Sequence, residues 1–344
     1  MQGGSAAGPA LWVHIGLPKT GSSAVQAAFK ASRSELRGAG VDYPDTGEFG
    51  GGHVRLAWPL LSRERKQQRD VLENINTGGL HDLWRALARE TSERDCTKVF
   101  VSTEYFSEVD PAALADCARA VSPDIRILVY LRRQDELIES GYKQSVKAGL
   151  TGRRFSFHGY TRMYDYSVLL AGWSQAFGRE RIVAKVYDEG LARRGVVADV
   201  VETLGIRVGV VPEIEERSNP SMHPALVELQ RLANALGETQ SDAVSLVRER
   251  IGSLESGAVR SFLSTDERQA ILAAYAESNA EVARTYFGRP DGHLFDDPQE
   301  RLDGAGRDAP IEVLAALGVL LASELSRVQE QVNGLLRRLD SDPR

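Results

Sequence analysis

Residues 11–23 of the chain read LWVHIGLPKTGSS, an apolar run that gives way to a lysine, a glycine and hydroxyl side chains. The next residues, 24–30, read AVQAAFK, which is typical of a helix. We therefore predict a strand, a tight loop and a helix in that order. The first N–H groups of such a helix have no intrahelical partner and lie at the positive end of the macrodipole, so the loop favours an oxyanion. The stretch predicts a phosphate-binding loop.

The loop differs from the one that nucleoside triphosphatases use in the position of its lysine. Gly16 and Gly21 have the glycine spacing of GxxxxGK[ST], in which a lysine follows the second glycine and a hydroxyl holds magnesium. Here Ser22 occupies the lysine position, and Lys19 stands two residues before Gly21. This displacement argues against an ordinary ATP or GTP site and favours a 5′-phosphate or a phosphosulfate. Alone, the loop could also be an ordinary βα turn, so a second site is needed.

A second anion-binding element follows another apolar run. Residues 125–131 read IRILVYL, the pattern of a buried strand, and Arg132 comes directly after it. Ser140 lies eight positions later, about two helical turns further on. In a strand-to-helix turn, both side chains are close enough to contact one phosphate. The pair predicts a second, separate anion site.

Together the two elements resemble those of the sulfotransferases that use 3′-phosphoadenylyl sulfate (PAPS). In that family a PKxGTT-like loop binds the 5′-phosphosulfate, and an arginine with a serine eight positions later binds the 3′-phosphate. The resemblance therefore implies that the donor is held by Pro18, Lys19, Thr20, Gly21, Ser22, Ser23, Arg132 and Ser140. It also implies that no metal is required.

Beyond these two motifs, several short sequence segments are most similar to those of bacterial carbohydrate-type sulfotransferases. The resemblance covers roughly residues 10–296 and is carried by GVDYP (40–44), VSTEYF (101–106), YKQ (142–144), WSQAFG (173–178) and VARTYFG (282–288). It also includes an Arg-x-Asn-x-Ser stretch that makes Arg217 a candidate lid residue over the nucleotide, although Ser221 could simply cap the next helix. One departure concerns Ala24, which stands where many cytosolic members have an aromatic that stacks on adenine, so the adenine contacts are unassigned.

Two residues are candidates for the general base that would activate an acceptor hydroxyl. Glu104 follows the expected strand at 98–102, where cytosolic members of the family place a histidine, and members that act on sugars often use a glutamate. His53 lies in a glycine-rich polar stretch that we expect to be flexible, and its ordinary pKa of ~6.5 suits base chemistry. The sequence leaves both open, with Glu48 as a weaker third candidate. If Glu104 is the base, His53 could hold the acceptor or orient the carboxylate.

Composition limits the classes of protein and partner. The chain has 344 residues, 42% of them hydrophobic, which suffices for one main domain, and its formal net charge of −6 argues against general binding to nucleic acid. The two cysteines, Cys96 and Cys117, form no CxxC pair and have no histidine-rich neighbourhood, so they do not suggest a zinc site. The first residues lack a signal-peptide pattern, and no apolar run is long enough to span a membrane, so we expect a cytoplasmic location.

The order of the expected elements predicts an α/β fold with a P-loop-like parallel sheet flanked by helices. Strands at 98–102 and 181–186 join those above, and strands that alternate with helices predict parallel pairing with ligands beyond the carboxyl ends. The pattern turns helical at 225–237 and 265–286. We predict a tail at 1–9, a sulfotransferase domain at 10–296, a linker at 297–310 and a C-terminal amphipathic helix at 311–340. That helix could pair subunits or dock onto its own domain.

We therefore expect an enzyme that moves a sulfuryl group from PAPS to an acceptor hydroxyl, on a carbohydrate or a glycosylated small molecule. Lys19 and the N–H groups of the loop would stabilise the departing adenosine 3′,5′-bisphosphate, and Ser22 and Ser23 would donate to the same phosphate. Two alternatives stay open. One is a P-loop kinase, against which the misplaced lysine counts, and the other is a noncatalytic nucleotide-binding scaffold.

Overall fold

The computed structural model describes residues 8–67, 79–207, 209–211, 224–235, 237, 262–296, 321, 325 and 327–334. The chain divides into two compact units. The first unit comprises the described parts of Met1–Leu137, Gly159–Ser218 and Leu272–Asp296, and the second those of Ile138–His158, Asn219–Ile271 and Asp297–Arg344. The predicted domain limits stay predictions.

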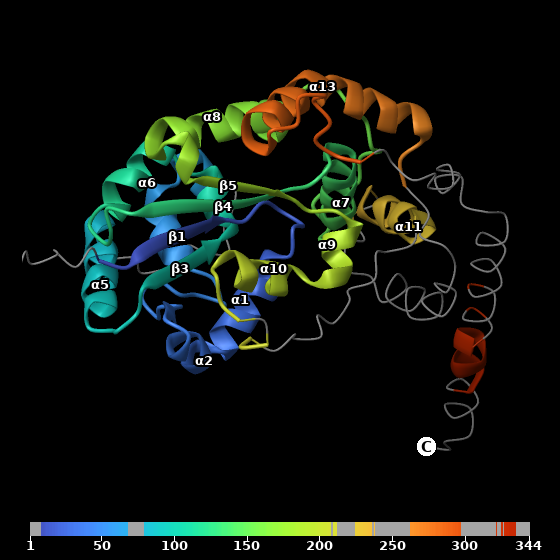
Figure 1. Ribbon diagram of the computed structural model, residues 1–344. Coiled ribbons are helices and arrows are strands. Elements are labelled where there is room, and N and C mark those ends of the chain that lie inside the picture. The colour runs from blue at the N-terminus through green and yellow to red at the C-terminus, as the bar shows by residue number, and fades with distance from the viewer. Residues whose placement is uncertain are drawn as a thin grey trace, which may run out of the picture. The chain divides into compact units, whose positions relative to one another are not determined.

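The first unit is built on a sheet of five strands, all of them parallel (Figure 1). The strands are β1 (Ala10–Ile15), β2 (Val41–Asp42), β3 (Lys98–Thr103), β4 (Ile125–Leu131) and β5 (Ile182–Val186), in the spatial order β2-β3-β1-β4-β5. β1 is central, because Leu11 pairs with Val99 on one side and with Ile125 on the other. The carboxyl ends of all five strands therefore meet at one edge of the sheet.

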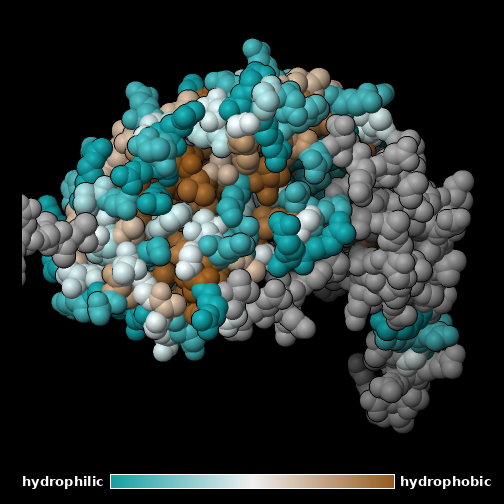
Figure 2. Space-filling view, in the orientation of Figure 1, coloured by the Kyte–Doolittle hydropathy of each residue, from teal (hydrophilic) through white to brown (hydrophobic). Residues whose placement is uncertain are grey.

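Both faces of the sheet are buried, which explains why the strands read as apolar runs rather than as alternating patterns. Leu11, Val13 and Ile15 of β1 join a hydrophobic cluster with residues of α3 (Val54–Ala57), α5 (Leu80–Ser92), α6 (Pro111–Ala118) and α8 (Tyr166–Phe177). Trp12 joins a second cluster with residues of α1 (Ser22–Ala31), α2 (Arg33–Gly38), α9 (Glu189–Arg194) and α10 (Val196–Thr203). In the space-filling view, hydrophobic side chains lie over the sheet and hydrophilic ones surround them (Figure 2).

In the described ranges, one or more helices follow each strand along the chain. They are α1 (Ser22–Ala31), α2 (Arg33–Gly38), α3 (Val54–Ala57), α4 (Arg63–Gln67), α5 (Leu80–Ser92), α6 (Pro111–Ala118), α7 (Gln134–Lys147), α8 (Tyr166–Phe177), α9 (Glu189–Arg194), α10 (Val196–Thr203), α11 (Pro224–Ala235) and α13 (Thr265–Phe287). Short 3-10 turns are η1 (Trp58–Leu60), η3 (Glu104–Glu108), η4 (Arg162–Tyr164) and η5 (Arg179–Arg181). The predicted α/β class with a parallel sheet is confirmed. Among the five strands of this sheet, the sequence missed the two-residue strand β2.

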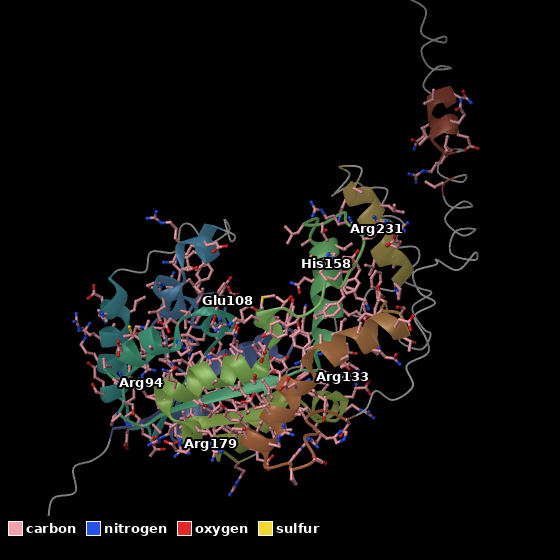
Figure 3. All side chains as sticks on the ribbon, turned by 90° about the horizontal axis from the view of Figure 1, so that it is seen from above. Arg94, Glu108, Arg133, His158, Arg179 and Arg231 are labelled. Carbon is pink, nitrogen blue, oxygen red and sulfur yellow. The ribbon has the colours of Figure 1, made fainter. Side chains whose placement is uncertain are left out.

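The second unit has its own polar and aromatic contacts. Arg231 of α11 pairs with Glu228 at 2.5 Å and donates to the carbonyl of Gly152 at 2.9 Å (Figure 3). Tyr142 packs against Phe155 and Phe262, with ring centroids 5.3 and 5.2 Å away. These contacts join α7 and α11 of this unit to the segments that follow α7 and precede α13.

Toward the C-terminus the structure describes only a few residues. The predicted linker at 297–310 lies outside them, as does most of the predicted helix at 311–340. Within that helix, Leu321, Leu325 and residues 327–334 are described, and all are helical. Among the helices of the described residues, none combines the length and the apolar character needed to cross a bilayer.

Candidate functional site

The predicted phosphate loop joins the central strand to α1. β1 ends at Ile15, α1 begins at Ser22, and Gly21 is the N-cap residue with a left-handed φ of 78°. No side chain caps this helix end, so its first N–H groups are left for another acceptor. Gly21 is required there, because a Cβ at this position would lie 2.6 Å from Cγ1 of Val196. The geometry is that of an anion-binding helix start.

Lys19 carries a backbone conformation that is rare for a residue with a side chain. It is exposed, and its φ is 63°, the one positive value outside glycine among the described residues. Such a conformation costs roughly 1–2 kcal/mol. Two contacts hold it: the Thr20 hydroxyl donates to the carbonyl of Leu17 at 2.8 Å, and Nη1 of Arg132 donates to the carbonyl of Lys19 at 2.8 Å. These contacts hold the backbone of Lys19 in a strained conformation within the loop.

Ser22 has a hydroxyl that is buried and lacks a hydrogen-bond partner among the described residues. Such a group is costly unless a ligand or water satisfies it. Gly16 lies directly beside it, because a Cβ at Gly16 would be 2.5 Å from Oγ of Ser22. The orphaned hydroxyl fits a loop that receives a phosphate oxygen.

Glu104 lies next to the same loop. It is the first residue of η3, directly after β3, and its side chain is exposed. A Cβ at Gly16 would be 3.4 Å from the Cα of Glu104, and the N–H of Gly16 donates to the carbonyl of Thr103 at 3.2 Å. The carboxylate candidate and the phosphate loop are therefore neighbours at the carboxyl edge of the sheet.

Arg132 reaches this edge from the end of β4. Its Nε pairs with Glu136 at 3.1 Å, and its Nη1 bonds Lys19 as described above. Nη2 has no hydrogen-bond partner in the part of the chain that the structure describes. The predicted arginine thus contacts the lysine loop directly and keeps one nitrogen for a further acceptor.

Tyr187, which the sequence analysis did not single out, lies next to the loop. The guanidinium carbon of Arg132 lies 5.7 Å from the centre of its ring, and a Cβ at Gly21 would lie 3.6 Å from its Cε2. The available signal was its position, because Tyr187 follows β5 as Glu104 follows β3 and Arg132 follows β4. An aromatic face therefore borders the loop on the side of β4 and β5.

Arg133, the neighbour of Arg132, points into the protein. It is 9% exposed, pairs with both carboxylate oxygens of Asp135 at 2.7 and 3.0 Å, and donates to the carbonyl of Asp296 at 3.3 Å (Figure 3). Its charge is compensated within the fold. Of the two adjacent arginines, only Arg132 lies at the lysine loop.

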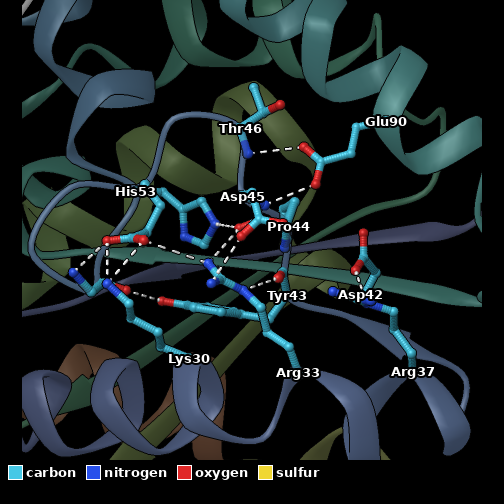
Figure 4. Close-up of polar contacts among 12 residues, drawn as sticks. Lys30, Arg33, Arg37, Asp42, Tyr43, Pro44, Asp45, Thr46, His53 and Glu90 are labelled. Carbon is cyan, nitrogen blue, oxygen red and sulfur yellow. Dashed lines mark hydrogen bonds and ion pairs between the residues drawn. The ribbon is translucent and has the colours of Figure 1, made fainter.

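His53 is fully buried, in contrast to the flexible polar stretch that the sequence suggested. Its Nε2 donates to the carbonyl of Pro44 at 3.0 Å (Figure 4). Its Nδ1 accepts from the N–H of Ser102 at 3.2 Å. Both ring nitrogens are occupied in the neutral tautomer. Burial lowers the pKa of His53 to about 4.

Glu48, the third candidate base, belongs to an ion-pair cluster. It lies 3.1 Å from Lys30 and 3.7 Å from Arg33, and it accepts from the N–H of Gly51 at 2.7 Å (Figure 4). Burial alone would raise the pKa of Glu48, but the Gly51 N–H and the two cations outweigh it and lower the pKa. This carboxylate serves to hold the segment around residue 50.

The remaining predicted residues are placed only in part. Pro18 and Ser23 are exposed on the loop, and Ser140 is half-buried on α7. Ser140 belongs to the second unit and Arg132 to the first, so their joint use stays a prediction. Arg217 lies outside the described residues. Within the described ranges, no group of three or more His, Cys, Asp or Glu side chains is arranged to hold a metal ion.

Comparisons with known proteins give three findings. No family model matches the chain. The chain is 30% identical over 193 residues to an uncharacterized protein of Archaeoglobus fulgidus, a match that covers 55% of this chain and 53% of that protein. The chain thus spans about half the length of this curated relative. A crystal structure of a sulfotransferase from Alicyclobacillus acidocaldarius aligns over 70% of this chain and 99% of its own, with 20% identity and a TM-score of 0.40.

Proposed function

We propose that the chain is a PAPS-dependent sulfotransferase that sulfates a hydroxyl of a carbohydrate or of a glycosylated small molecule. The observation that carries the proposal is the loop itself. Lys19 is held in a left-handed conformation beside an uncapped helix start and an orphaned buried hydroxyl, and Arg132 bonds its carbonyl. A loop of this chemistry suits a phosphosulfate with a second phosphate near the arginine.

In this proposal, the donor lies along the carboxyl edge of the sheet. The N–H groups at the start of α1 and the hydroxyls of Ser22 and Ser23 bind the 5′-phosphosulfate, with Pro18, Thr20 and Gly21 shaping the loop. Nη2 of Arg132 binds the 3′-phosphate. Many family members have an aromatic residue at the position of Ala24, and Tyr187 takes over its role here. The ring of Tyr187 stacks on adenine. Arg217 is proposed as a lid residue.

Glu104 is proposed as the general base. It accepts the proton of the acceptor hydroxyl while the acceptor oxygen attacks sulfur and the bond between sulfur and the bridging oxygen breaks. The products are the sulfated acceptor, adenosine 3′,5′-bisphosphate and a protonated Glu104. Lys19 and the loop N–H groups stabilise the negative charge that grows on the bridging oxygen.

His53 is proposed as a positioning residue rather than the base. Both of its ring nitrogens are in hydrogen bonds, and its pKa of about 4 leaves little affinity for a proton near neutrality. Its N–H also donates to the carbonyl of Ser102 at 2.7 Å, two residues before Glu104. His53 thereby fixes the segment around residue 50 to the end of β3.

Binding of adenosine nucleotides tests the proposal against a P-loop kinase. Calorimetry should show binding of adenosine 3′,5′-bisphosphate without metal and much weaker binding of ADP with magnesium, because only a sulfotransferase needs a 3′-phosphate site. Arg132→Ala should weaken the bisphosphate much more than adenosine 5′-monophosphate. No heat with the bisphosphate, or tighter binding of ADP with magnesium, would reject the proposal. Binding without turnover over a broad acceptor panel would favour a noncatalytic scaffold.

Turnover with labelled PAPS tests the role of the lysine. Lys19→Ala should lower turnover by at least ~10²-fold, as expected when a stabiliser of the leaving group is lost. Lys98→Ala is the matched control, because Lys98 begins β3 at the opposite edge of the sheet. Unchanged turnover in Lys19→Ala would remove it from this role.

Because PAPS is made from ATP inside cells, the proposal also favours a cytoplasmic enzyme.

A further inference from the structure

The side chain of Ser102 lies where three elements of the first unit meet. Its hydroxyl accepts a hydrogen bond from Nε2 of Gln26 on α1 at 3.2 Å and shares one of 2.8 Å with Nδ1 of His14 on β1. Ser102 itself belongs to β3. One hydroxyl therefore joins the central strand, the strand beside it and the helix that begins at the phosphate loop.

The backbone of Ser102 joins a fourth segment. Its carbonyl accepts from the N–H of His53 at 2.7 Å, and its N–H donates to Nδ1 of His53 at 3.2 Å. The N–H, the carbonyl and the hydroxyl of Ser102 are thus all engaged. Replacing the side chain alone would break the contacts with α1 and β1 and keep those with His53.

The contacts of the Ser102 hydroxyl are shielded from water. Ser102 and His14 are both fully buried, and the ring of His14 stacks on that of Phe100 with 6.0 Å between their centres. A Cβ at Gly52 would lie 2.8 Å from Oε1 of Gln26, so the amide of Gln26 packs closely against the backbone there. Because water cannot replace a lost partner in such a setting, these hydrogen bonds hold their groups firmly.

These contacts lie between the two groups that the proposed reaction must align. Gln26 follows Ser22 by four residues, about one turn of α1, so both side chains lie on the same face of the helix. Glu104 follows Ser102 by two residues, directly after β3. The helix therefore carries the loop proposed to bind the donor, and the end of the strand carries the proposed base.

We propose that Ser102 is a positioning residue, and this rests on the sulfotransferase function proposed above. Its hydroxyl holds α1 against the end of β3, which keeps the sulfur of a bound donor aligned with Glu104 and the acceptor oxygen. Ser102 touches neither donor nor acceptor and acts on the rate through this alignment. A displacement of about 1 Å between reacting groups can cost ~10²-fold in rate.

Hydrogen exchange measured by NMR tests the linkage without any donor. The probes are the N–H groups of Gly16 and His53, which bond carbonyls at the end of β3. Both should exchange about tenfold faster in Ser102→Ala and in Gln26→Ala, because the loss of one hydrogen bond makes local opening easier. Unchanged exchange at these two N–H groups would overturn the proposal. Gln26→Ala alters a half-buried side chain and gives the answer if Ser102→Ala does not fold.

Ser122→Ala is the matched control, because it also removes the hydroxyl of a buried serine. Ser122 precedes β4, and its hydroxyl donates to the carbonyl of Asp124, which also accepts from the N–H of Leu11 at 2.8 Å. This variant should speed exchange at Leu11 and leave the two probe N–H groups within about twofold of their original rates. Equal acceleration at Leu11 and at the probes in Ser102→Ala would indicate a general loss of stability and would overturn the proposal.

Steady-state kinetics with labelled PAPS tests the effect on the rate. Ser102→Ala should lower kcat by ~10-fold or more and keep the Kd of the bisphosphate within about threefold, because the donor groups of the loop are intact. Adding Gln26→Ala should cause little further loss, since both changes break the same contact. Ser122→Ala should keep kcat. An unchanged kcat, an equal loss of kcat and affinity, or losses that multiply in the double variant would each overturn the proposal.

The two proposals fail separately. If the unmodified protein transfers no sulfuryl group, the sulfotransferase function is rejected, while faster exchange confined to the two probe N–H groups still supports the linkage through Ser102. If turnover is present and exchange is unchanged in the variants, the sulfotransferase function stands and the role of Ser102 is rejected. Circular dichroism and urea unfolding confirm that the variants fold.

Discussion

Two histidines of the first unit are completely buried and neutral, which links the stability of the fold to pH. His14 on β1 bonds the hydroxyl of Ser102 at 2.8 Å and packs against the rings of Phe100 and Tyr130. Burial lowers the pKa of His14 and that of His53 to about 4, from an ordinary value of 6.5. Each histidine resists protonation only while the protein is folded.

We expect the free energy of unfolding to fall as the pH drops below about 6.5. Between pH 6.5 and 4 the unfolded chain binds protons at both histidines and the folded chain does not, so acid favours unfolding. From pH 7 to pH 5 each histidine should remove about 2 kcal/mol. Urea unfolding at the two pH values measures the change. The double variant His14→Gln with His53→Gln should flatten the profile, and a flat profile in the unmodified protein would contradict the prediction.

The proposed base has its own test at the residue scale. Glu104→Gln should lower turnover by ~10²-fold or more with little change in bisphosphate affinity, because it removes only proton transfer. His53→Gln should keep turnover within about tenfold, since an amide can donate to Pro44 and accept from Ser102 as the imidazole does. Steady-state kinetics with labelled PAPS gives both values. A larger loss in His53→Gln at unchanged stability would return the role of base to the histidine.

Residue identity alone could not show which side chains lie at the loop and which are buried. The sequence pointed to Arg132 because it follows a strand, and the structure brings it to the loop, whereas Arg133 is buried against Asp135. The burial of His53 could not be predicted, because it depends on Pro44 and on Ser102, which is 49 positions away. Tyr187 was missed because no motif marks it, only its place after β5.

At the scale of elements, the entry of α1 is the most constrained feature. Gly21→Ala should lower the free energy of unfolding by about 1–2 kcal/mol, since alanine disfavours a φ of 78°. It should also weaken bisphosphate binding, because the new Cβ would meet Val196 and displace the loop. Thermal unfolding and calorimetry measure the two effects.

Gly38→Ala is the control for this change. Gly38 ends α2, and a Cβ there would have no atom within 4 Å. Stability should stay the same or rise by up to about 1 kcal/mol, the propensity difference between the two residues in a helix. If both variants behaved alike, the left-handed turn would not be what matters at Gly21.

The elements themselves were largely predictable. Four of the five strands follow from apolar runs, because both faces of a parallel sheet are covered, and α13 was expected at 265–286 against Thr265–Phe287 in the structure. β2 was missed, since two residues carry no period. The stretch at 50–55 was expected to be flexible, because Ser102, which anchors His53, is distant in sequence.

At the scale of the whole molecule, the described part of the C-terminal helix carries an apolar stripe. Leu321, Leu325, Val328 and Val332 are 55, 68, 52 and 43% exposed. Their spacing of four, three and four residues matches the a and d positions of a coiled coil. Such a stripe favours pairing of two chains along this helix.

We therefore predict that the protein is a dimer that Leu325→Glu converts to a monomer. The new carboxylate would be buried unpaired in the seam, which is strongly unfavourable. Asn333→Glu adds the same charge beside the stripe and should leave the dimer intact. Light scattering after size-exclusion chromatography gives the mass. A monomer before mutation would indicate that the helix docks onto its own chain.

The left-handed backbone at Lys19 has a consequence for attempts to engineer this protein. A glycine at that position would relieve roughly 1 kcal/mol of backbone strain while removing the ammonium group. Selection of random variants for heat tolerance alone should therefore enrich Lys19→Gly, and these selected variants should be inactive. Sorting for retained product formation is needed to keep the lysine.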